Sequence, residues 1–179
     1  MLCGGESRRM GRDKALLPVD GRPMALRVAD ALHHAGANAV VAQGGDPEAL
    51  AGLGIPVRPD REPGGGPLPA TLQALEEATE ELVVVLSCDL LHPEPAAIAA
   101  LVRALEGADA AQAAVPRDDG HLQWTHAAWR RSAAPTLAAA RTAGAASLRR
   151  AAADLTLVEV SGLDPAALAD ADLPSDLGG

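Results

Sequence analysis

The sequence of 179 residues contains no phenylalanine and no tyrosine, and its aromatic side chains are limited to Trp124 and Trp129. Its apolar residues are almost all alanine, leucine and valine. A core therefore has to be built from small aliphatic side chains, which favours helices packed on a sheet. The length fits one domain of ordinary size, and we expect a single domain over residues 1–179.

Basic residues are also scarce, with 15 Lys and Arg against 24 Asp and Glu, which gives a net charge of −9. This charge repels polyanions and argues against nucleic acid or a membrane surface as the partner, while a local cationic pocket stays compatible with it. The opening residues MLCGGESRRMG lack the apolar run of a signal peptide or membrane span. Cys3 and Cys88 form neither a metal-ligand pattern nor a disulfide framework. We therefore expect a protein of the reducing cytoplasm.

The hydrophobic pattern alternates short strand-like runs with longer helix-like stretches, which predicts βαβ units and a mostly parallel sheet. The expected helices are Pro23–Ala35, Leu68–Thr79, Pro95–Leu105, Ala133–Ala143 and Ser147–Ala153, with a short one near Pro174. The expected strands are Ala39–Ala42, Ile55–Arg58, Leu82–Leu86, Ala110–Val115, Gln123–Ala128 and Leu155–Val160. The continuous apolar run Leu82–Leu86 predicts a central strand that is buried on both faces. The turn-rich Arg117–Gly120 allows antiparallel pairing around it.

The segment from Gly4 to Lys14 combines three glycines, a hydroxyl group and four cations. Glycines let backbone N–H groups converge on phosphate oxygens, and the cations add positive charge, so this composition suits a polyphosphate. The alternative is a flexible basic N-terminus. The segment has no Gly-Lys-Ser/Thr and no G-x-G-x-x-G after a strand, which excludes both common phosphate-binding motifs.

Asp89 directly follows the predicted central strand Leu82–Leu86. Open α/β sheets bind ligands beyond the carboxyl ends of their strands, so this position predicts a functional carboxylate. The alternative is an N-terminal helix cap. The neighbouring Cys88 has no histidine or helix start in the sequence that would activate it, and we interpret it as a buried structural thiol.

The residues Leu2–Leu17 resemble the signature of molybdenum cofactor guanylyltransferases, L-A-G-G-x-S-x-R-M-G-x-D-K-x-L-L, with Cys3 in place of the alanine. The resemblance continues at Gly21–Met24, at Asp60, at Gly66–Leu68 and at Cys88–Asp89, so it spans most of the chain. It implies a Rossmann-like three-layer α/β/α nucleotidyltransferase fold with a mostly parallel sheet. That family usually has a strand before L-A-G-G, so we expect a first strand that is truncated here or lies upstream of Met1.

The resemblance also implies the roles of individual residues. The implied nucleotide-binding residues are Leu2, Cys3, Gly4, Gly5, Lys14, Asp60 and Asp89. Arg9, Lys14 and Asp89 would act in catalysis, and Asp89 would hold Mg²⁺, which prefers one or two carboxylates together with phosphate oxygens and water. Asp172 is a candidate for a second carboxylate ligand. It lies in Asp170–Leu177, which resembles a degraded form of the family's N-x-N-T-P-x-D-L.

Further residues have weaker assignments. The five histidines lack metal-ligand spacing, but His126 lies in Gln123–Ala127, which resembles a family segment Q-P-L-H-A that would line the acceptor pocket. Gln43 is the amide nearest to the place where the family tends to have an asparagine close to the base. Arg130 and Arg131 lie at a predicted helix start, where cations are unfavourable, and binding of an acceptor phosphate is one interpretation of this pair.

The activity implied is Mg²⁺-dependent transfer of GMP from GTP to a molybdopterin phosphate with release of pyrophosphate. The implied partners are GTP, a molybdopterin-type small molecule and proteins of molybdenum cofactor biosynthesis. Alternatives are a cytidylyltransferase for the same cofactor, an NTP transferase for another phosphorylated metabolite, and a catalytically degenerate nucleotide-binding regulator. Leu2–Gly5 favours guanine because the cytidylyl relatives tend to have L-A-A-G. The retention of Arg9, Lys14, Asp60 and Asp89 argues against the regulator.

Overall fold

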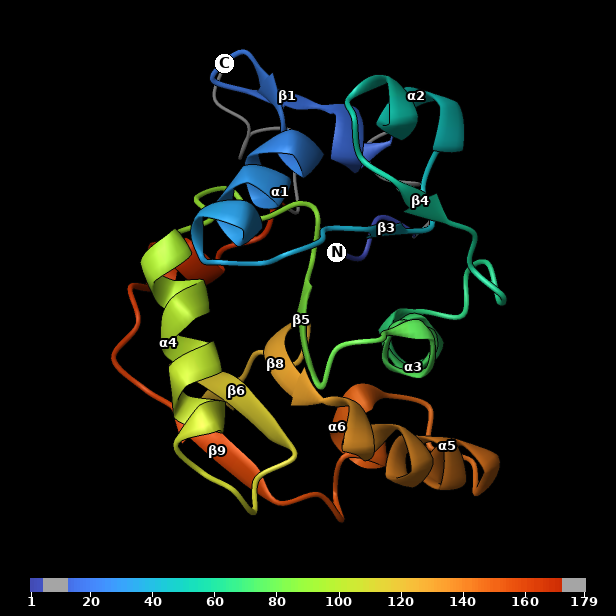
Figure 1. The fold of residues 1–179 in the computed structure, drawn as a ribbon, viewed down its shortest axis with the longest axis vertical. Coiled ribbons are helices and arrows are strands. Elements are labelled where there is room, and N and C mark those ends of the chain that lie inside the picture. Colours follow the sequence, from blue (N-terminus) through green and yellow to red (C-terminus); the bar gives the residue numbers. More distant parts are fainter. Residues whose placement is uncertain (5–12, 172–179) are drawn as a thin grey trace.

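A computed structural model describes residues 1–4 and 13–171, and within them helices cover both faces of a sheet (Figure 1). The strands are β1 (Pro18–Val19), β2 (Arg22–Pro23), β3 (Ala42–Gln43), β4 (Val57–Arg58), β5 (Leu82–Leu86), β6 (Ala113–Asp118), β7 (His121–Leu122), β8 (His126–Arg130) and β9 (Leu157–Val160). The helices are α1 (Met24–His34), α2 (Pro47–Gly52), α3 (Pro67–Glu77), α4 (Pro95–Glu106), α5 (Ala134–Thr142) and α6 (Leu148–Ala151), with 3-10 turns η1 (Lys14–Leu16), η2 (Arg131–Ala133) and η3 (Pro165–Leu168). The helix predicted near Pro174 lies outside the described residues.

The sheet is mixed but mostly parallel, as the sequence predicts. β8 pairs antiparallel with both β5 and β6, so these two strands run in the same direction. β9 pairs parallel with β6, and β4 pairs parallel with β3. The antiparallel return of the chain begins at the β6–β7 hairpin, where Asp119 and Gly120 have φ angles of 42° and 76°. Positive φ at both turn residues is what the tight turn between two twisted strands requires.

Met1–Cys3 takes the place of the first strand, in the middle of the sheet. Leu2 forms parallel bridges to Gln43 in β3 and to Ser87, which directly follows β5. Its amide donates to the Leu86 carbonyl at 2.7 Å, and its carbonyl accepts from the Cys88 amide at 3.0 Å. The sheet order is therefore β4, β3, the Leu2 segment, β5, β8, β6 and β9. Because this segment is so short, Gly4 lies at the carboxyl edge of the sheet.

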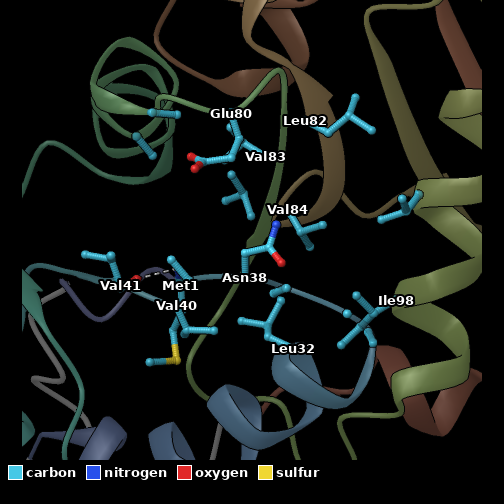
Figure 2. Close-up of a pocket in the computed structure, with 18 of the residues that line it drawn as sticks. Met1, Leu32, Asn38, Val40, Val41, Glu80, Leu82, Val83, Val84 and Ile98 are labelled. Carbon is cyan, nitrogen blue, oxygen red and sulfur yellow. Dashed lines mark hydrogen bonds between the residues drawn. The ribbon is translucent and has the colours of Figure 1, made fainter.

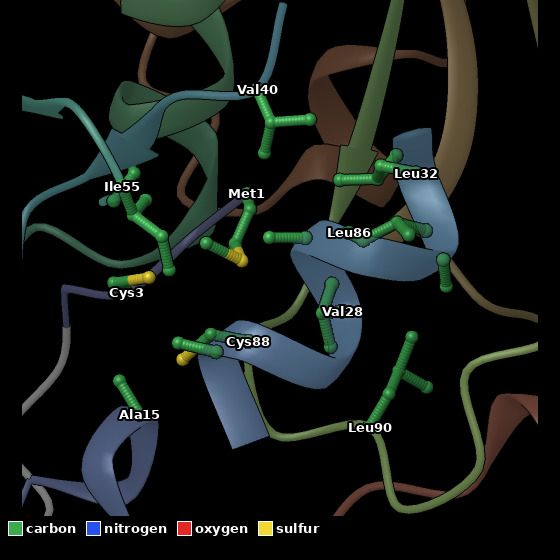
Figure 3. Packing of buried hydrophobic residues seen from close by; sticks show 14 of the residues in the cluster. Met1, Cys3, Ala15, Val28, Leu32, Val40, Ile55, Leu86, Cys88 and Leu90 are labelled. Atoms are coloured by element: carbon green, nitrogen blue, oxygen red, sulfur yellow. The ribbon is translucent and has the colours of Figure 1, made fainter. Parts of the chain in front are cut away.

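Two apolar layers cover the sheet, and the side chains of β5 alternate between them. Leu86 packs into a cluster with α1, and Val84 packs against residues of α4. Figure 3 shows Leu86 and Cys88 beside Val28 and Leu32 of α1. Val85 faces the opposite cluster, which α3, α5 and α6 supply. The absence of phenylalanine and tyrosine is thus compatible with a filled core, because alanine and leucine dominate both clusters and Trp129 is the one large aromatic side chain buried in the second.

One end of β5 borders a cavity of about 400 Å³ that lies between residues 38–41 and residues 82–85. Figure 2 shows Val40 and Val41 on one side of this cavity and Val83 and Val84 on the other. The prediction that β5 is buried on both faces is correct for Val85 and Leu86, which are each 2% exposed, but wrong for residues 82–84, which are half-buried. The reason is that, in the described part of the chain, no strand lies beside residues 82–84 on the side of this cavity.

Among residues 1–4 and 13–171, no helix combines the length and apolarity that crossing a membrane requires.

Candidate nucleotide site

A second cavity of about 350 Å³ lies at the carboxyl edge of the sheet, where ligand sites form in open α/β folds. The residues around it come from segments far apart in the sequence and include Leu2, Gly4, Asp60, Gly66, Ser87 and Thr125. The larger cavity beside β5 lies at the opposite, amino end of that strand and is lined mainly by valine, leucine and alanine. Because substrates with phosphates need convergent polar groups, the smaller cavity is the candidate site.

The carboxylate of Asp60 packs directly onto two glycines. A Cβ atom on Gly4 would lie 2.1 Å from Asp60 Oδ2, and one on Gly44 would lie 2.4 Å from the same atom. Gly44 also has a φ angle of +74°, a conformation that other residues rarely adopt. Gln43, which is 3% exposed, donates from Nε2 to Asp60 Oδ1 at 3.1 Å. The glycines and Gln43 therefore fix both the place and the orientation of Asp60.

The loop that carries Asp60 is held from α3 and α5. Gln73 of α3 donates to the Pro59 carbonyl at 3.0 Å and accepts from the Arg61 amide at 2.9 Å. The Arg61 side chain forms an ion pair with Glu77 of α3 at 2.7 Å. Arg141 of α5 forms an ion pair with Glu62 and lowers the pKa of that carboxyl group. These contacts order a loop that has almost no apolar side chains of its own.

Asp89 receives two donors at the end of β5. Lys14 Nζ lies 2.9 Å from Asp89 Oδ2, and the Ser87 hydroxyl donates to Oδ1. The side chains of Lys14 and Asp89 are 20% and 13% exposed, respectively. Lys14 begins the 3-10 turn η1, which Asp13 caps by accepting from the Ala15 amide at 3.0 Å. Asp89 is not a helix cap, since the next helix, α4, begins at Pro95.

The C-terminal part of the described chain returns to this point. Ala171 donates its amide to the Asp89 carbonyl at 2.9 Å, and its own carbonyl accepts from Lys14 Nζ. Asp170 forms an antiparallel bridge with Leu90. We call residues 169–171 the C-terminal strap. Asp170 and Ala171, the first two residues of the segment that resembles the degraded family motif, therefore lie at the site although they are far from Asp89 along the chain.

The structure brings together most of the residues that the sequence singles out. Leu2, Gly4 and Asp60 line the candidate cavity, Cys3 lies in the core beneath it, and Lys14 and Asp89 form an ion pair next to Ser87. The sequence did not indicate that Ser87 is the second partner of Asp89 or that the Asp60 carboxylate packs against Gly44. The adjacent glycines Gly44 and Gly45 directly after a strand were the available signal for the latter. The predicted residues Gly5, Arg9 and Asp172 lie outside the described residues.

One weaker assignment does not agree with the structure, and another agrees only in part. Arg130 and Arg131 pair near Leu82, at the far end of β5 from Asp89. Arg130 donates to the carbonyls of Leu105 and Ala111, and Arg131 donates to the Ala78 carbonyl, so the two arginines bind backbone carbonyls at or after the C-terminal ends of α4 and α3. An acceptor-phosphate role for this pair is therefore wrong. The segment of His126 does reach the cavity, but Thr125 lines it, whereas His126 is 1% exposed.

Both cysteines are buried, which confirms the prediction for Cys88. A hydrogen bond with the Cys3 side chain, together with burial, raises the pKa of the Cys88 thiol well above its ordinary value. A thiol with a raised pKa holds its proton at neutral pH and is a poor nucleophile. Cys88 thus packs the core beneath Asp89.

Asp89 fits a single-carboxylate Mg²⁺ site that phosphate oxygens and water would complete, the mode in which proteins usually hold this ion. In residues 1–4 and 13–171 there is no group of three or more His, Cys, Asp or Glu side chains that could form an all-protein metal cage. A resident site with several protein ligands is therefore not present in that part of the chain.

Most residues of this site lie in the part of the chain that matches a known protein family. Residues 1–159 match the family described as the MobA-like NTP transferase domain. The chain belongs to this family. In this member of the MobA-like family, the Leu2 segment lies in the middle of the sheet and β8 is antiparallel to its neighbours.

Relatives in the family share more than a third of the aligned residues. A protein of Pelotomaculum thermopropionicum named probable molybdenum cofactor guanylyltransferase is 39% identical over 123 residues, which are 69% of this chain and 58% of that protein. The molybdenum cofactor guanylyltransferase of Rhodobacter capsulatus is 37% identical over 143 residues, 76% of this chain and 70% of that protein. The chain thus matches little more than half the length of the first of these relatives.

A solved structure shows the same fold. The molybdopterin-guanine dinucleotide biosynthesis protein A of Archaeoglobus fulgidus superposes with a TM-score of 0.77, over 98% of this chain and 92% of that one. Its sequence identity is 20%, so this likeness establishes the three-layer α/β arrangement only.

Proposed function

We propose that the chain transfers GMP from GTP to the phosphate of a molybdopterin, with release of pyrophosphate. The observation that carries this proposal is the Lys14–Asp89 pair. It lies at the carboxyl end of β5, next to the cavity that Asp60 and Ser87 line. The names of the two relatives supply the acceptor and the base. The product is the guanine dinucleotide form of the cofactor.

The reaction requires positioning and charge neutralisation more than covalent help. An oxygen of the acceptor phosphate attacks the α-phosphorus of GTP and forms a new P–O bond. The bond from the α-phosphorus to the bridging oxygen breaks, and pyrophosphate leaves with the electron pair. No general base is required, because a phosphate monoester is already an anion at neutral pH.

Lys14 is placed to neutralise the triphosphate, and Arg9 is the second cation that we assign to it. The proposal includes Mg²⁺ as the metal that Asp89 holds, where it would supply positive charge to the phosphate oxygens. Ser87 keeps the Asp89 carboxylate oriented by its hydrogen bond to Oδ1. The work of the chain is therefore to present preorganised charges, the largest contribution in most reactions of this type.

Asp60 is the residue that we propose to select guanine. An ionised carboxylate only accepts hydrogen bonds. Guanine presents two adjacent donors, N1–H and the N2 amino group, whereas cytosine presents an acceptor at N3 beside its amino group. Gln43 donates to Asp60 Oδ1, and Oδ2 faces Gly4 and Gly44. A fixed carboxylate at this edge of the cavity favours the guanine base over cytosine.

A nucleotide titration tests this proposal. Affinities for GTP, CTP, ATP and UTP are measured with and without Mg²⁺, together with pyrophosphate release in the presence of molybdopterin. We expect GTP to bind most tightly and to be the nucleotide turned over. Preferential binding of CTP would favour the cytidylyltransferase, and GTP binding without turnover would favour a degenerate regulator; either result overturns the proposal.

The matched variants for this titration are Asp60→Asn and Asp46→Asn. We expect Asp60→Asn to lose the preference for GTP over CTP, since an amide can donate as well as accept. Asp46 caps α2 through the amides of Glu48 and Ala49. Asparagine caps a helix about as well as aspartate, so Asp46→Asn is expected to leave nucleotide selectivity unchanged.

The proposal also keeps the cytoplasm as the compartment and other proteins of molybdenum cofactor biosynthesis as partners. Two buried free thiols, Cys3 and Cys88, suit a reducing compartment.

A further inference from the structure

His126 is a buried polar side chain that three apolar residues follow along β8. It begins β8, lies opposite Leu86 in the ladder with β5, and is 1% exposed. The residues after it, Ala127, Ala128 and Trp129, are all fully buried. Burying an imidazole among apolar side chains is unfavourable unless its nitrogens find partners. A histidine at this place therefore needs a reason beyond core packing.

The one hydrogen-bond partner of its ring in the described chain is Asp170. His126 Nε2 lies 3.1 Å from Asp170 Oδ1, and no described group accepts from or donates to Nδ1. A carboxylate oxygen accepts hydrogen bonds, so this contact is one in which His126 Nε2–H donates to Asp170 Oδ1. The contact joins residues that are 44 positions apart, and it fastens the C-terminal strap to the end of the sheet.

The strap in turn holds the Lys14–Asp89 pair. The Leu91 amide donates to the Ala169 carbonyl at 2.9 Å, and the Ala171 amide donates to the Asp89 carbonyl at 2.9 Å. The Ala171 carbonyl accepts from Lys14 Nζ. Asp170 lies between these two backbone contacts and is held by His126. The His126 side chain therefore helps to set the position of the Ala171 carbonyl, which binds Lys14 Nζ.

We propose that His126 is a positioning residue, which acts through Asp170 and the C-terminal strap to hold Lys14 and Asp89 in place for the transfer. The expected effect on the rate of transfer rests on the proposed function, whereas the expected effect on the order of residues 169–171 does not. The inference predicts that loss of the His126–Asp170 hydrogen bond loosens residues 169–171 selectively. A displacement of the charged groups by about 1 Å lowers the rate of the chemical step far more than it lowers the affinity for the nucleotide.

The test compares His126→Ala with His126→Gln, whose amide reaches approximately as far as Nε2 and restores the donor. We expect His126→Ala to speed hydrogen exchange at the Ala171 and Leu91 amides about tenfold, and to lower kcat by about the same factor with little change in KM for GTP. The Leu50 amide in α2, which donates to the Asp46 carbonyl, serves as the internal reference and is expected not to change. His126→Gln is expected to recover most of the loss.

Two controls decide between positioning and general destabilisation. His121→Ala removes an exposed histidine whose ring forms a hydrogen bond with the nearby Asp119 carbonyl, and it is expected to leave both readouts unchanged. In a double-mutant cycle, Asp170→Ala is expected to add almost nothing to His126→Ala, because both remove the same contact. Additive effects, or uniform loss of protection that includes Leu50, would overturn the inference. If the wild-type chain transfers no GMP, the proposed function fails, while exchange at Ala171 and Leu91 still decides the role of His126.

Discussion

Lys14 Nζ lies 2.9 Å from Asp89 Oδ2, although 75 positions separate the two residues along the chain. The contact joins the last residue of the glycine-containing motif Gly4–Lys14 to a residue just after the central strand β5. Less than a quarter of either side chain is exposed. Charges that are partly withdrawn from water interact more strongly than charges on the surface, so the two groups are expected to act as a unit.

Replacement of Lys14 by alanine is expected to lower GMP transfer by about a hundredfold, the scale of losing one preorganised charge at a reacting phosphate. The measurement is pyrophosphate release at saturating GTP. The matched control is Arg103→Ala, which removes an exposed cation from α4 and is expected to have no effect. Wild-type turnover by a folded Lys14→Ala variant would remove Lys14 from the reaction.

Gly44→Ala is expected to weaken GTP binding about tenfold, because the new Cβ would lie 2.4 Å from Asp60 Oδ2 and 2.8 Å from Gly4 Cα and would push apart two residues that line the candidate cavity. The matched control is Gly21→Ala. Gly21 has a φ angle of +75°, against +74° for Gly44, but nothing lies within 4 Å of an added Cβ. Both variants therefore carry similar backbone strain, about 1–2 kcal/mol of unfolding free energy.

Chemical denaturation and GTP titration of the two glycine variants separate the two effects. Both variants should lose unfolding free energy, but only Gly44→Ala should also bind GTP more weakly. Equal affinities for GTP would mean that Asp60 does not contact the nucleotide.

A designed extension that adds a short Val/Ile run before Met1 is expected to stabilise the chain by entering the cavity beside β5. The cavity lies between residues 38–41 and 82–85, and the Met1 amino group faces it while donating to the Val41 carbonyl at 2.9 Å. Each buried aliphatic side chain contributes about 1.5–3 kcal/mol. An extension of the same length made of Gly and Ser is the control. Equal thermal midpoints for the two extended chains would show that the cavity accepts no strand.

The stability of this chain should also rise with pH in the window just below 8. Burial lowers the pKa of the Met1 amino group from its ordinary value of 8.0. The unfolded chain therefore binds a proton in this window that the folded chain does not, so protonation favours unfolding. Denaturation midpoints across this window measure the effect. N-terminal acetylation, which removes the charge, is expected to abolish this part of the pH dependence; an unchanged profile after acetylation would contradict it.

Much of the fold could be predicted because local patterns determine it. The run Leu82–Leu86 gave the central strand with its correct ends, and α1 lies within the predicted Pro23–Ala35. The helix α2 was missed, although Asp46 caps it and Pro47 occupies its first turn, because it is only 6 residues long and has little periodicity. The antiparallel place of β8 depends on long-range pairing, which the turn at Arg117–Gly120 allowed but did not determine.

The candidate site was predictable where residues are contiguous in a motif and not where distant segments meet. Lys14, Asp60 and Asp89 were identified from their motifs and from the position of Asp89 after a strand. The roles of Ser87, Gln43 and the C-terminal strap depend on tertiary contacts, such as the Lys14–Ala171 hydrogen bond across 157 positions. Arg130 and Arg131 were misassigned because the sequence does not show which end of the sheet a charged pair occupies.

The most direct test of the proposed function follows the α-phosphate of labelled GTP into molybdopterin, with wild type and Asp89→Asn side by side. We expect the wild-type chain with Mg²⁺ to move the label into a guanine dinucleotide and to release unlabelled pyrophosphate. Asp89→Asn should bind GTP in part but transfer no label, because the amide keeps the shape of the carboxylate and loses the charge that Mg²⁺ selects. Label that never leaves GTP in the wild type, or equal transfer by Asp89→Asn, would contradict this account.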